Sequence, residues 1–578
     1  MSRIFRIALA QINPIVGDIT SNTYKILDYV QRARQLNVDL VAFPELSITG
    51  YPPEDLLFKK SFLQANVVAM NSIIKASEDV AVVVGYVEQD GTDLFNSAAL
   101  GYQGRYIDSY RKIFLPNYGV FDEERYFKKG DVCPVYEING TQVGINICED
   151  IWYSMGPTVL QCGAGAEVIV NINASPFHAG KRIEREAMIS DRSCAHQVFL
   201  GYANTVGGQD ELVFDGSSVV VDYAGSIMTR GISFDEDLIV ADLDMDVYFD
   251  HVRDNQNKDV ITSSDFGVAK NIFVSSFVPR SKAELPTPRD VSELSEIEEI
   301  YHALVMGTRD YVRKSGFTKA VIGLSGGIDS ALTCVIAVDA LGRDNVVGVA
   351  MPSRYSSEGS IIDAKELADN LAIDFWEIPI EPAHVSFTNM LEPMFKDTNP
   401  NVAEENVQAR IRGNVMMTIA NKFGWIVLTT GNKSEMAMGY ATLYGDMAGG
   451  FAVLKDVPKT LVYDLSRQRN QRSSDGLLIP VATIEKPPSA ELRPDQTDQD
   501  SLPPYDELDP IVKAYVEEDF SYIELVAAGY SEAVVQKVIS SVDRNEYKRR
   551  QAPPGVKITP RAFGKDRRLP IINKYSQF

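Results

Sequence analysis

The chain has 578 residues, which at about 150 residues per domain allows two to four domains. Its formal net charge of −23 argues against a broad nucleic-acid-binding surface, although a small basic pocket for one nucleotide remains compatible with it. Five cysteines without a CxxC pair argue against a disulfide scaffold, and no apolar run approaches the ~18 residues that span a bilayer, so we expect a cytoplasmic protein without membrane or nucleic-acid partners.

The first half alternates short apolar runs with amphipathic segments, which predicts layered α/β structure with antiparallel strands in its sheet. A helix is predicted over 22–35, where Ile26, Val30 and Ala33 follow helical spacing. The predicted strands are rich in β-branched residues and bounded by turn-forming residues; they cover 4–12, 40–43, 80–86, 143–147, 168–172, 213–221 and 238–243.

A charged, proline-rich stretch, PRSKAELPTPRD at 279–290, interrupts this pattern. We place a linker over 276–290, between a first domain of residues 1–275 and a second domain of residues 291–578. The sequence after it predicts a helix over 292–314 and then strands over 320–324, 346–350, 375–380 and 425–430, each followed by a helical segment. Strands separated by helices indicate a doubly wound parallel sheet that binds ligands at the carboxyl ends of its strands. Two polar stretches, 466–476 and 486–506, are predicted to be mobile loops.

The string VIGLSGGIDS at 321–330 links a predicted strand to a predicted helix. Its glycines allow a tight turn, and Asp329 or Ser330 is expected to cap a helix that begins near Ala331 and whose N–H groups attract phosphate. Neither GK[ST] nor GxGxxG occurs in this string, which excludes the two common phosphate-loop motifs. An ordinary glycine-rich turn is the alternative.

The pattern SGGxDS resembles the pyrophosphate loop of the ATP pyrophosphatases. Together with TTGNKSE at 429–435 and GYATLYGD at 439–446, it resembles the NAD synthetases over about 292–568. That family uses ATP to adenylate the nicotinate carboxylate of deamido-NAD, and ammonia then displaces AMP. The resemblance implies an α/β domain of the doubly wound, Rossmann-like ATP pyrophosphatase type.

The same resemblance implies the roles of individual residues. The ATP contacts would be Gly323, Leu324, Ser325, Gly326, Gly327, Ile328, Asp329, Ser330, Thr430 and Lys459. Deamido-NAD would contact Asn406, Arg410, Glu435 and Lys548, and Mg²⁺ would be held by Asp329 and Glu435. Leu443 and Gly450 replace a lysine and an acidic residue of ammonia-using relatives, so we expect different substrate contacts there.

Three strings in the first half carry groups suited to amide hydrolysis: FPEL at 43–46, RKIFLP at 111–116 and NICEDIW at 146–152. A thiol attacks an amide as thiolate, which requires a base and a cation that stabilises the oxyanion. Taken alone, Cys148 could be a buried structural thiol. The three strings in this order resemble the nitrilase superfamily over about 3–270, which implies an α-β-β-α layered domain.

In that resemblance Cys148 is the nucleophile, Glu45 is the base, and Lys112 orients Glu45 and stabilises the tetrahedral intermediate. Tyr118, Ser175 and Lys181 would contact glutamine.

Together the two halves resemble the glutamine-dependent NAD(+) synthetases. The expected reaction converts deamido-NAD, ATP and glutamine to NAD, AMP, pyrophosphate and glutamate. Ammonium has no lone pair for attack, so we expect an enclosed passage for ammonia, completed in a homo-oligomer. Two alternatives stay open: an ATP pyrophosphatase that amidates another carboxylate, and a nucleotide-binding regulator with a degenerate hydrolase domain.

Overall fold

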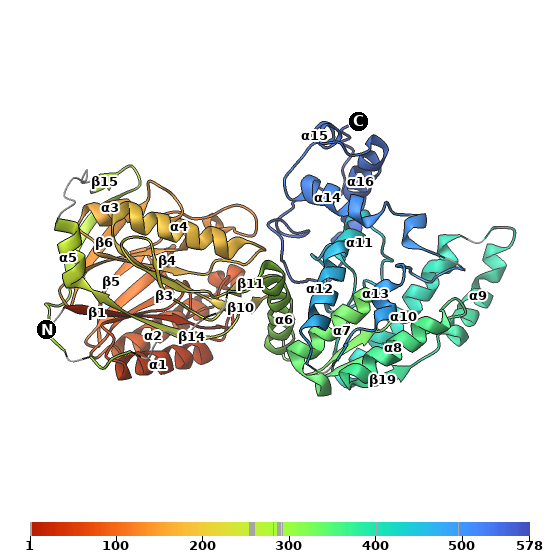
Figure 1. Ribbon diagram of the computed structural model, residues 1–578, viewed down its shortest axis with the longest axis horizontal. Coiled ribbons are helices and arrows are strands. Elements are labelled where there is room, and N and C mark those ends of the chain that lie inside the picture. Colours follow the sequence, from red (N-terminus) through yellow and green to blue (C-terminus); the bar gives the residue numbers. More distant parts are fainter. Residues whose placement is uncertain are drawn as a thin grey trace. The chain divides into compact units, whose positions relative to one another are not determined.

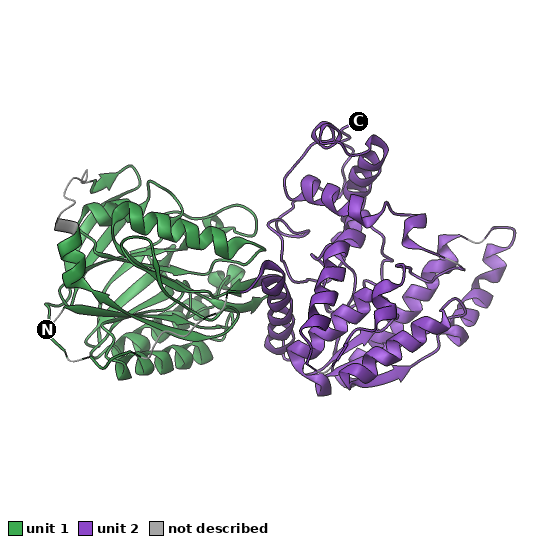
Figure 2. Cartoon of the chain, in the orientation of Figure 1, with its two compact units in different colours: residues 1–209, 213–293 green, residues 210–212, 294–578 purple. Residues whose placement is uncertain are grey.

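The computed structural model describes residues 3–253, 261–280, 282–285, 291, 293–399, 401–474, 476–494 and 496–578. The chain divides into two compact units (Figure 2). Unit 1 comprises Met1–Gln209 and Val213–Glu293, and unit 2 comprises Asp210–Leu212 and Leu294–Phe578. The described residues of the predicted linker contain no helix or strand, whereas residues 281 and 286–290 lie outside the described part. No helix in the described ranges is long and apolar enough to cross a membrane.

Unit 1 is built on two large mixed sheets. The first has the order β14 (Asp237–Asp244), β1 (Ile4–Gln11), β2 (Leu40–Ala42), β3 (Ala81–Asp90), β4 (Asp93–Tyr102), β5 (Arg105–Arg111). The second has the order β13 (Ile227–Arg230), β12 (Val219–Val221), β9 (Phe199–Asn204), β8 (Val168–Asn173), β7 (Thr141–Ile147), β6 (Val132–Ile138), β16 (Gly267–Phe273), β15 (Ser263–Ser264). A short hairpin joins β10 (Val206–Gln209) and β11 (Leu212–Asp215).

Alternation along the strands explains the layers of unit 1. On β1, Phe5, Ile7 and Leu9 enter a core shared with residues of β7 and β8, so the two sheets pack face to face. Ala8 and Ala10 point the other way, into a core shared with α1 (Ile19–Gln35) and α2 (Lys60–Lys75). The outer face of the second sheet packs on α4 (Lys181–His196). Figure 1 shows α1 and α2 on one face of the two packed sheets and α4 on the opposite face. This arrangement is the predicted α-β-β-α layering.

The remaining helices of unit 1 are short. They are η1 (Glu54–Phe58), η2 (Glu123–Arg125), η3 (Cys148–Ile151), α3 (Pro157–Gly163) and α5 (Met245–Arg253).

Two predictions for unit 1 need correction. The single strand predicted over 213–221 is two strands, because Gly216 and Ser217 adopt positive φ angles of 66° and 50° and turn the chain between β11 and β12. The helix predicted from residue 22 begins at Ile19, where Asp18 caps it by accepting a hydrogen bond from the Ser21 N–H.

Unit 2 contains the predicted doubly wound parallel sheet. Its order is β19 (Asp374–Glu377), β18 (Val346–Ala350), β17 (Ala320–Gly323), β20 (Ile426–Thr429), β21 (Phe451–Ala452), and all four pairings are parallel. The order along the chain reverses between β17 and β20, which is where such sheets bind ligands.

Helices make up the rest of the regular structure of unit 2, some beside the sheet and some beyond it (Figure 1). They are α6 (Glu296–Lys314), α7 (Ile328–Leu341), η4 (Arg343–Asn345), α8 (Glu358–Leu371), α9 (Glu381–Phe395), α10 (Val402–Phe423), α11 (Lys433–Met438), α12 (Lys459–Gln471), α13 (Val481–Glu485), η5 (Asp498–Asp500), α14 (Tyr505–Val516), α15 (Tyr522–Ala527), α16 (Glu532–Arg544) and α17 (Glu546–Arg549).

Three predictions for unit 2 also change. The helix after the glycine loop begins at Ile328 with Gly327 as its N-cap, so Asp329 and Ser330 lie in its first turn rather than capping it. The stretch predicted as a mobile loop from Ser466 is helical as far as Gln471, because Val462, Leu465 and Ser466 form a buried face of α12. The helix predicted from residue 292, which lies outside the described residues, begins at Glu296 after the Ser295 cap.

The second predicted loop, 486–506, contains only η5 and the start of α14 in its described part. Residues 475 and 495 of the two predicted loops lie outside the described ranges.

Candidate active sites

A fully buried lysine stands between two carboxylates in unit 1. The Nζ atom of Lys112, just after β5, lies 2.7 Å from Oε1 of Glu45 and 2.9 Å from Oε1 of Glu123. The second oxygen of Glu45 accepts a hydrogen bond from the Ala174 N–H at 3.0 Å. Buried charges are retained only where partners compensate their desolvation, so these contacts fix all three groups in position.

Glu123 was missed by the sequence analysis. It lies in the acidic run DEE at 122–124, where spacing gives no reason to choose one carboxylate. The Tyr51 hydroxyl donates to its Oε1 at 2.9 Å. Burial, helped by the negative charge of Glu45 and opposed by Lys112, raises the pKa of Glu123 to about 7.

Cys148 begins η3 directly after β7 and has a φ of +46°. This left-handed conformation is uncommon for a residue with a side chain, and strain of this kind gathers at functional sites. Burial and then the charge of Glu45 raise the pKa of the Cys148 thiol well above its usual value, whereas Lys112 lowers it. The resting thiol is therefore protonated and needs a base before it can attack.

Asp150, two residues after the cysteine, joins the strand ends around it. Its carboxylate accepts hydrogen bonds from the Tyr110 hydroxyl at 2.6 Å and from the N–H groups of Phe114 at 2.8 Å and Ile147 at 3.1 Å. Because Lys112 lies between Tyr110 and Phe114, Asp150 ties the lysine-bearing segment to the turn that presents Cys148.

The predicted glutamine contacts lie on segments next to Cys148. The exposed Tyr118 donates its hydroxyl to the carboxylate of Glu149, with both distances 3.0 Å. The Nζ of Lys181 lies 4.0 Å from the centre of the Trp152 ring, and burial lowers the pKa of this lysine. Ser175 is buried, and its N–H donates to Asn204. Their contact with glutamine stays a prediction.

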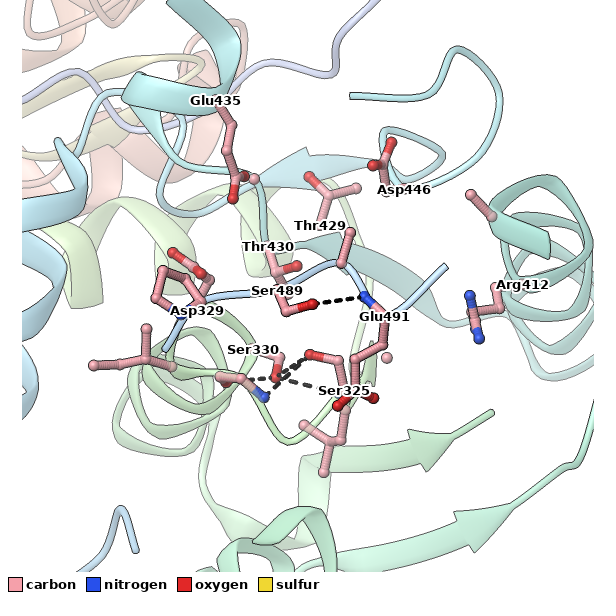
Figure 3. A pocket seen from close by; sticks show the side chains of 18 of the residues that line it. Ser325, Asp329, Ser330, Arg412, Thr429, Thr430, Glu435, Asp446, Ser489 and Glu491 are labelled. Atoms are coloured by element: carbon pink, nitrogen blue, oxygen red, sulfur yellow. Dashed lines mark hydrogen bonds between the residues drawn. The ribbon is translucent and has the colours of Figure 1, made fainter. Parts of the chain in front are cut away.

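Unit 2 has a cavity of about 300 Å³ at the carboxyl ends of β17, β18 and β20 (Figure 3). Ten predicted residues line it: Gly323, Leu324, Ser325, Gly327, Ile328, Asp329, Ser330, Thr430, Glu435 and Lys459. Gly326 is packed behind it with a φ of +77°, and a Cβ there would lie 2.3 Å from the Ser360 carbonyl oxygen. Only glycine fits that position.

Internal hydrogen bonds hold the glycine loop open toward the cavity. The Ser330 hydroxyl donates to the Gly327 carbonyl at 2.9 Å and accepts from the Ser325 N–H at 3.3 Å. The Ser325 hydroxyl accepts from the Gly327 N–H at 3.2 Å. A loop of this kind at a helix N-terminus suits a phosphate group.

Asp329 and Glu435 face this cavity from α7 and α11. Asp329 forms an ion pair with Lys459 and accepts a hydrogen bond from the Asn432 amide at 2.9 Å. Burial and the charge of Asp329 raise the pKa of Glu435 well above its usual value. Among the described residues no group of three or more His, Cys, Asp or Glu side chains could hold a metal. Two carboxylates fit Mg²⁺ where substrate phosphates supply further oxygens.

Asn406, Arg410 and Lys548 do not line the cavity. Instead they hold the segment 439–443 beside it: Thr442 donates to Asn406, Arg410 donates to the Leu443 carbonyl, and Lys548 donates to the carbonyls of Gly439 and Ala441. Their contact with deamido-NAD therefore stays a prediction.

Five cavity-lining charges escaped the sequence analysis: Arg412, Asp446, Lys486, Glu491 and Asp498. They lie in a helix and in polar loops, where spacing alone does not show which side chains face a ligand. Burial raises the pKa of Asp446 to about 6 and also raises that of Asp498.

Comparison with known proteins places both sites in one family. Residues 6–249 match the carbon–nitrogen hydrolase family model and residues 300–552 match the NAD synthase model. A glutamine-dependent NAD(+) synthetase from Thermotoga maritima is 46% identical and covers 99% of both chains. The chain belongs to the glutamine-dependent NAD(+) synthetase family.

Other members of the glutamine-dependent NAD(+) synthetase family support the assignment. The protein from Aquifex aeolicus is 46% identical over 99% of this chain and 100% of its own. The structure of a glutamine-dependent NAD(+) synthetase from Acinetobacter baumannii, determined with ADP, covers all of both chains with 41% identity and a TM-score of 0.75.

Proposed function

We propose that this enzyme forms NAD from deamido-NAD, ATP and glutamine, and releases AMP, pyrophosphate and glutamate. The observation that carries the proposal is the presence, in one chain that matches this family over its full length, of a buried Glu45–Lys112–Cys148 set and a phosphate-type loop. A regulator with a degenerate hydrolase domain would not be expected to retain Glu45, Lys112 and Cys148 together.

In unit 1, Glu45 accepts the Cys148 proton as Sγ attacks the glutamine amide carbon. The Lys112 ammonium, already 2.7 Å from Glu45, stabilises the negative charge that develops on the amide oxygen. Glu45 returns the proton to the departing nitrogen, so that neutral ammonia and a Cys148 thioester result. Glu45 then deprotonates a water that cleaves the thioester, which releases glutamate and restores the thiol.

In unit 2, the glycine loop and Lys459 hold the ATP phosphates, while the nicotinate carboxylate attacks the α-phosphorus and pyrophosphate leaves. Ammonia then attacks the acyl carbon of the adenylate, and AMP leaves. Asp329 and Glu435 would hold Mg²⁺, which supplies charge neutralisation for the departing pyrophosphate. We further propose that ammonia travels through an enclosed passage in a homo-oligomer, because protonation in bulk water would remove its lone pair. The five cysteines all lie within the described residues and none is in a disulfide, which fits the proposed cytoplasmic location.

Separate nitrogen sources test this division of labour. Cys148→Ala should abolish NAD formation from glutamine and preserve NAD formation from added ammonium, each measured with deamido-NAD and ATP. Cys133→Ala, which removes another buried thiol of unit 1, is the matched control and should preserve both. Loss of both activities in a folded Cys148→Ala protein would contradict the proposal. Failure of the wild type to convert deamido-NAD with either source would favour amidation of another carboxylate.

A further inference from the structure

Arg412 is the one basic residue among the described cavity-lining side chains that has no carboxylate in an ion pair. Lys459 pairs with Asp329, and Lys486 pairs with Asp363 at 3.1 Å. Within the described residues, the guanidinium of Arg412 makes one hydrogen bond, from Nε to the Met351 carbonyl at 3.0 Å. Its Nη groups are thereby left for a ligand.

Arg412 is half-buried, so its charge is partly removed from water and has no carboxylate partner among the described residues. Burial lowers its pKa to about 10, and only Glu491 opposes that shift. Taking a charge out of water is unfavourable unless a partner compensates it. An arginine kept in such a position is explained most directly by an anion that binds there.

Glu491 is not placed to be that partner. Its carboxylate accepts hydrogen bonds from the hydroxyls of Ser357 at 2.9 Å and Ser360 at 2.7 Å. These bonds anchor the segment around residue 491 to the start of α8. Glu491 therefore acts on Arg412 only through electrostatic attraction, without a hydrogen bond or ion pair among the described residues.

The position of Arg412 in the cavity indicates which kind of anion it would bind. In Figure 3, Arg412 and Asp329 lie on opposite sides, with Ser325 between them. The Met351 carbonyl that anchors Arg412 directly follows β18, the neighbour of the strand that carries the glycine loop. A planar guanidinium that lines the same cavity as a phosphate-type loop suits bidentate contact with phosphate oxygens.

We infer that Arg412 binds a phosphate group of a nucleotide substrate through its Nη groups, across the cavity from Asp329. The inference rests on the proposed function, in which ATP and deamido-NAD both carry phosphates. The shared chemistry is the phosphate, and experiment decides which of the two substrates supplies it.

The test compares Arg412→Gln and Arg412→Lys with the wild type. Calorimetry measures the Kd of ATP and of deamido-NAD separately, and the ammonium-driven assay gives the KM of each. We expect Arg412→Gln to raise the Kd and KM of one substrate by about tenfold or more, and Arg412→Lys to recover part of the loss, because lysine restores the charge without the planar fork. Lys422→Gln, at an exposed position on the same helix, is the matched control.

The outcome assigns the phosphate. If only the Kd and KM of ATP rise, Arg412 binds the triphosphate. If only those of deamido-NAD rise, Arg412 binds the phosphates of the dinucleotide. Unchanged Kd and KM values for both substrates in a folded variant would overturn the inference. If Arg412→Gln does not fold, equal affinities of Arg412→Lys and wild type would also overturn it. Weaker ATP binding in a protein that forms no NAD would preserve the inference and refute only the proposed function.

Discussion

The two candidate sites differ in whether their charged side chains are paired within the protein. In unit 1, Lys112 is shared by Glu45 and Glu123, so the charges of the hydrolytic site are compensated by the protein alone. In unit 2, Arg412 has no carboxylate partner within the described residues and Glu435 carries a strongly raised pKa. The charges of the first site are paired within the protein, whereas we propose that substrate phosphates and a cation complete the second.

The largest effect is expected at Lys112. Lys112→Met leaves two buried carboxylates without their cation, which should lower the free energy of unfolding by about 3–5 kcal/mol and abolish detectable glutaminase activity. Ammonium-driven NAD formation should persist in the fraction that stays folded, as measured beside thermal unfolding. Glutamine hydrolysis near the wild-type rate would show that the cluster is structural only.

The sequence predicted the residues that follow strands and missed those whose direction depends on packing. Glu45 and Cys148 each come after an apolar run, and Lys112 directly precedes the apolar residues 113–115, so the local pattern pointed to all three. Arg410 and Arg412 are two positions apart on α10, about 200° around the helix, and therefore face different ways. The weak amphipathic pattern of α10 did not reveal that Arg412 faces the cavity while Arg410 bonds to Leu443.

Tertiary packing also overrode local composition. The polar residues after Ser466 suggested a loop, but helix α12 continues to Gln471 because one narrow face of it is buried. The antiparallel and parallel layers were predictable from alternation and from strand–helix order. The break at Gly216 was missed, although the polar stretch DGSS at 215–218 between two apolar runs carries a turn signal.

Removal of Asp329 is the corresponding test in unit 2, because Asp329 is the ion-pair partner of Lys459. Asp329→Ala removes the partner of Lys459 and a proposed Mg²⁺ ligand, so ammonium-driven NAD formation should fall by at least about a hundredfold. Basal glutamine hydrolysis should continue, because the charges of unit 1 are compensated within that unit. Asp344→Ala, at an exposed position after α7, is the control. Retained NAD formation would remove Asp329 from the proposed mechanism.

Asn96 should matter for the preorganisation of unit 1. Its buried side-chain amide donates to Glu45 at 2.7 Å and to Glu123 at 3.4 Å, and its backbone carbonyl accepts from the backbone N–H of Lys112 at 2.8 Å. Asn96→Ala should lower glutaminase activity by about 10–100-fold.

The pH profile separates positioning from stability. Loss of a donor to the carboxylates disfavours their charged forms, so the acid limb of the Asn96→Ala profile should move to higher pH. The other titratable groups near the cluster are Lys112, Tyr51, Cys148, Glu149 and Asp150. Asn66→Ala, which removes a buried amide bonded to Val87, should reduce stability without moving that limb. An unmoved limb in Asn96→Ala would contradict the positioning role.

Asp509 should matter for the geometry of unit 2. Its carboxylate accepts hydrogen bonds from the Ser434 hydroxyl and from the N–H and hydroxyl of Thr460, both at 2.9 Å, and thereby joins the starts of α11 and α12. Asp509→Asn weakens this link between the two helices, so ammonium-driven turnover should fall about tenfold. Ser434→Ala should be non-additive with it in a double-mutant cycle, because both substitutions act on the same set of hydrogen bonds. Additive losses would show independent effects.

The smallest predicted effect is the pH dependence contributed by Glu123. Its pKa of about 7 lies above the ordinary value of 4.5, so the folded protein retains a proton there that the unfolded chain releases between these pH values. The stabilising contribution of that proton is complete below about pH 4.5 and is lost as the pH rises to about 7. Glu123→Gln cannot titrate, so the Tm of the wild type should fall relative to that of the variant across this window and then level off. A constant Tm difference from pH 5 to 8 would mean that Lys112 keeps Glu123 ionised, and that the hydrolytic site is more fully compensated than its burial implies.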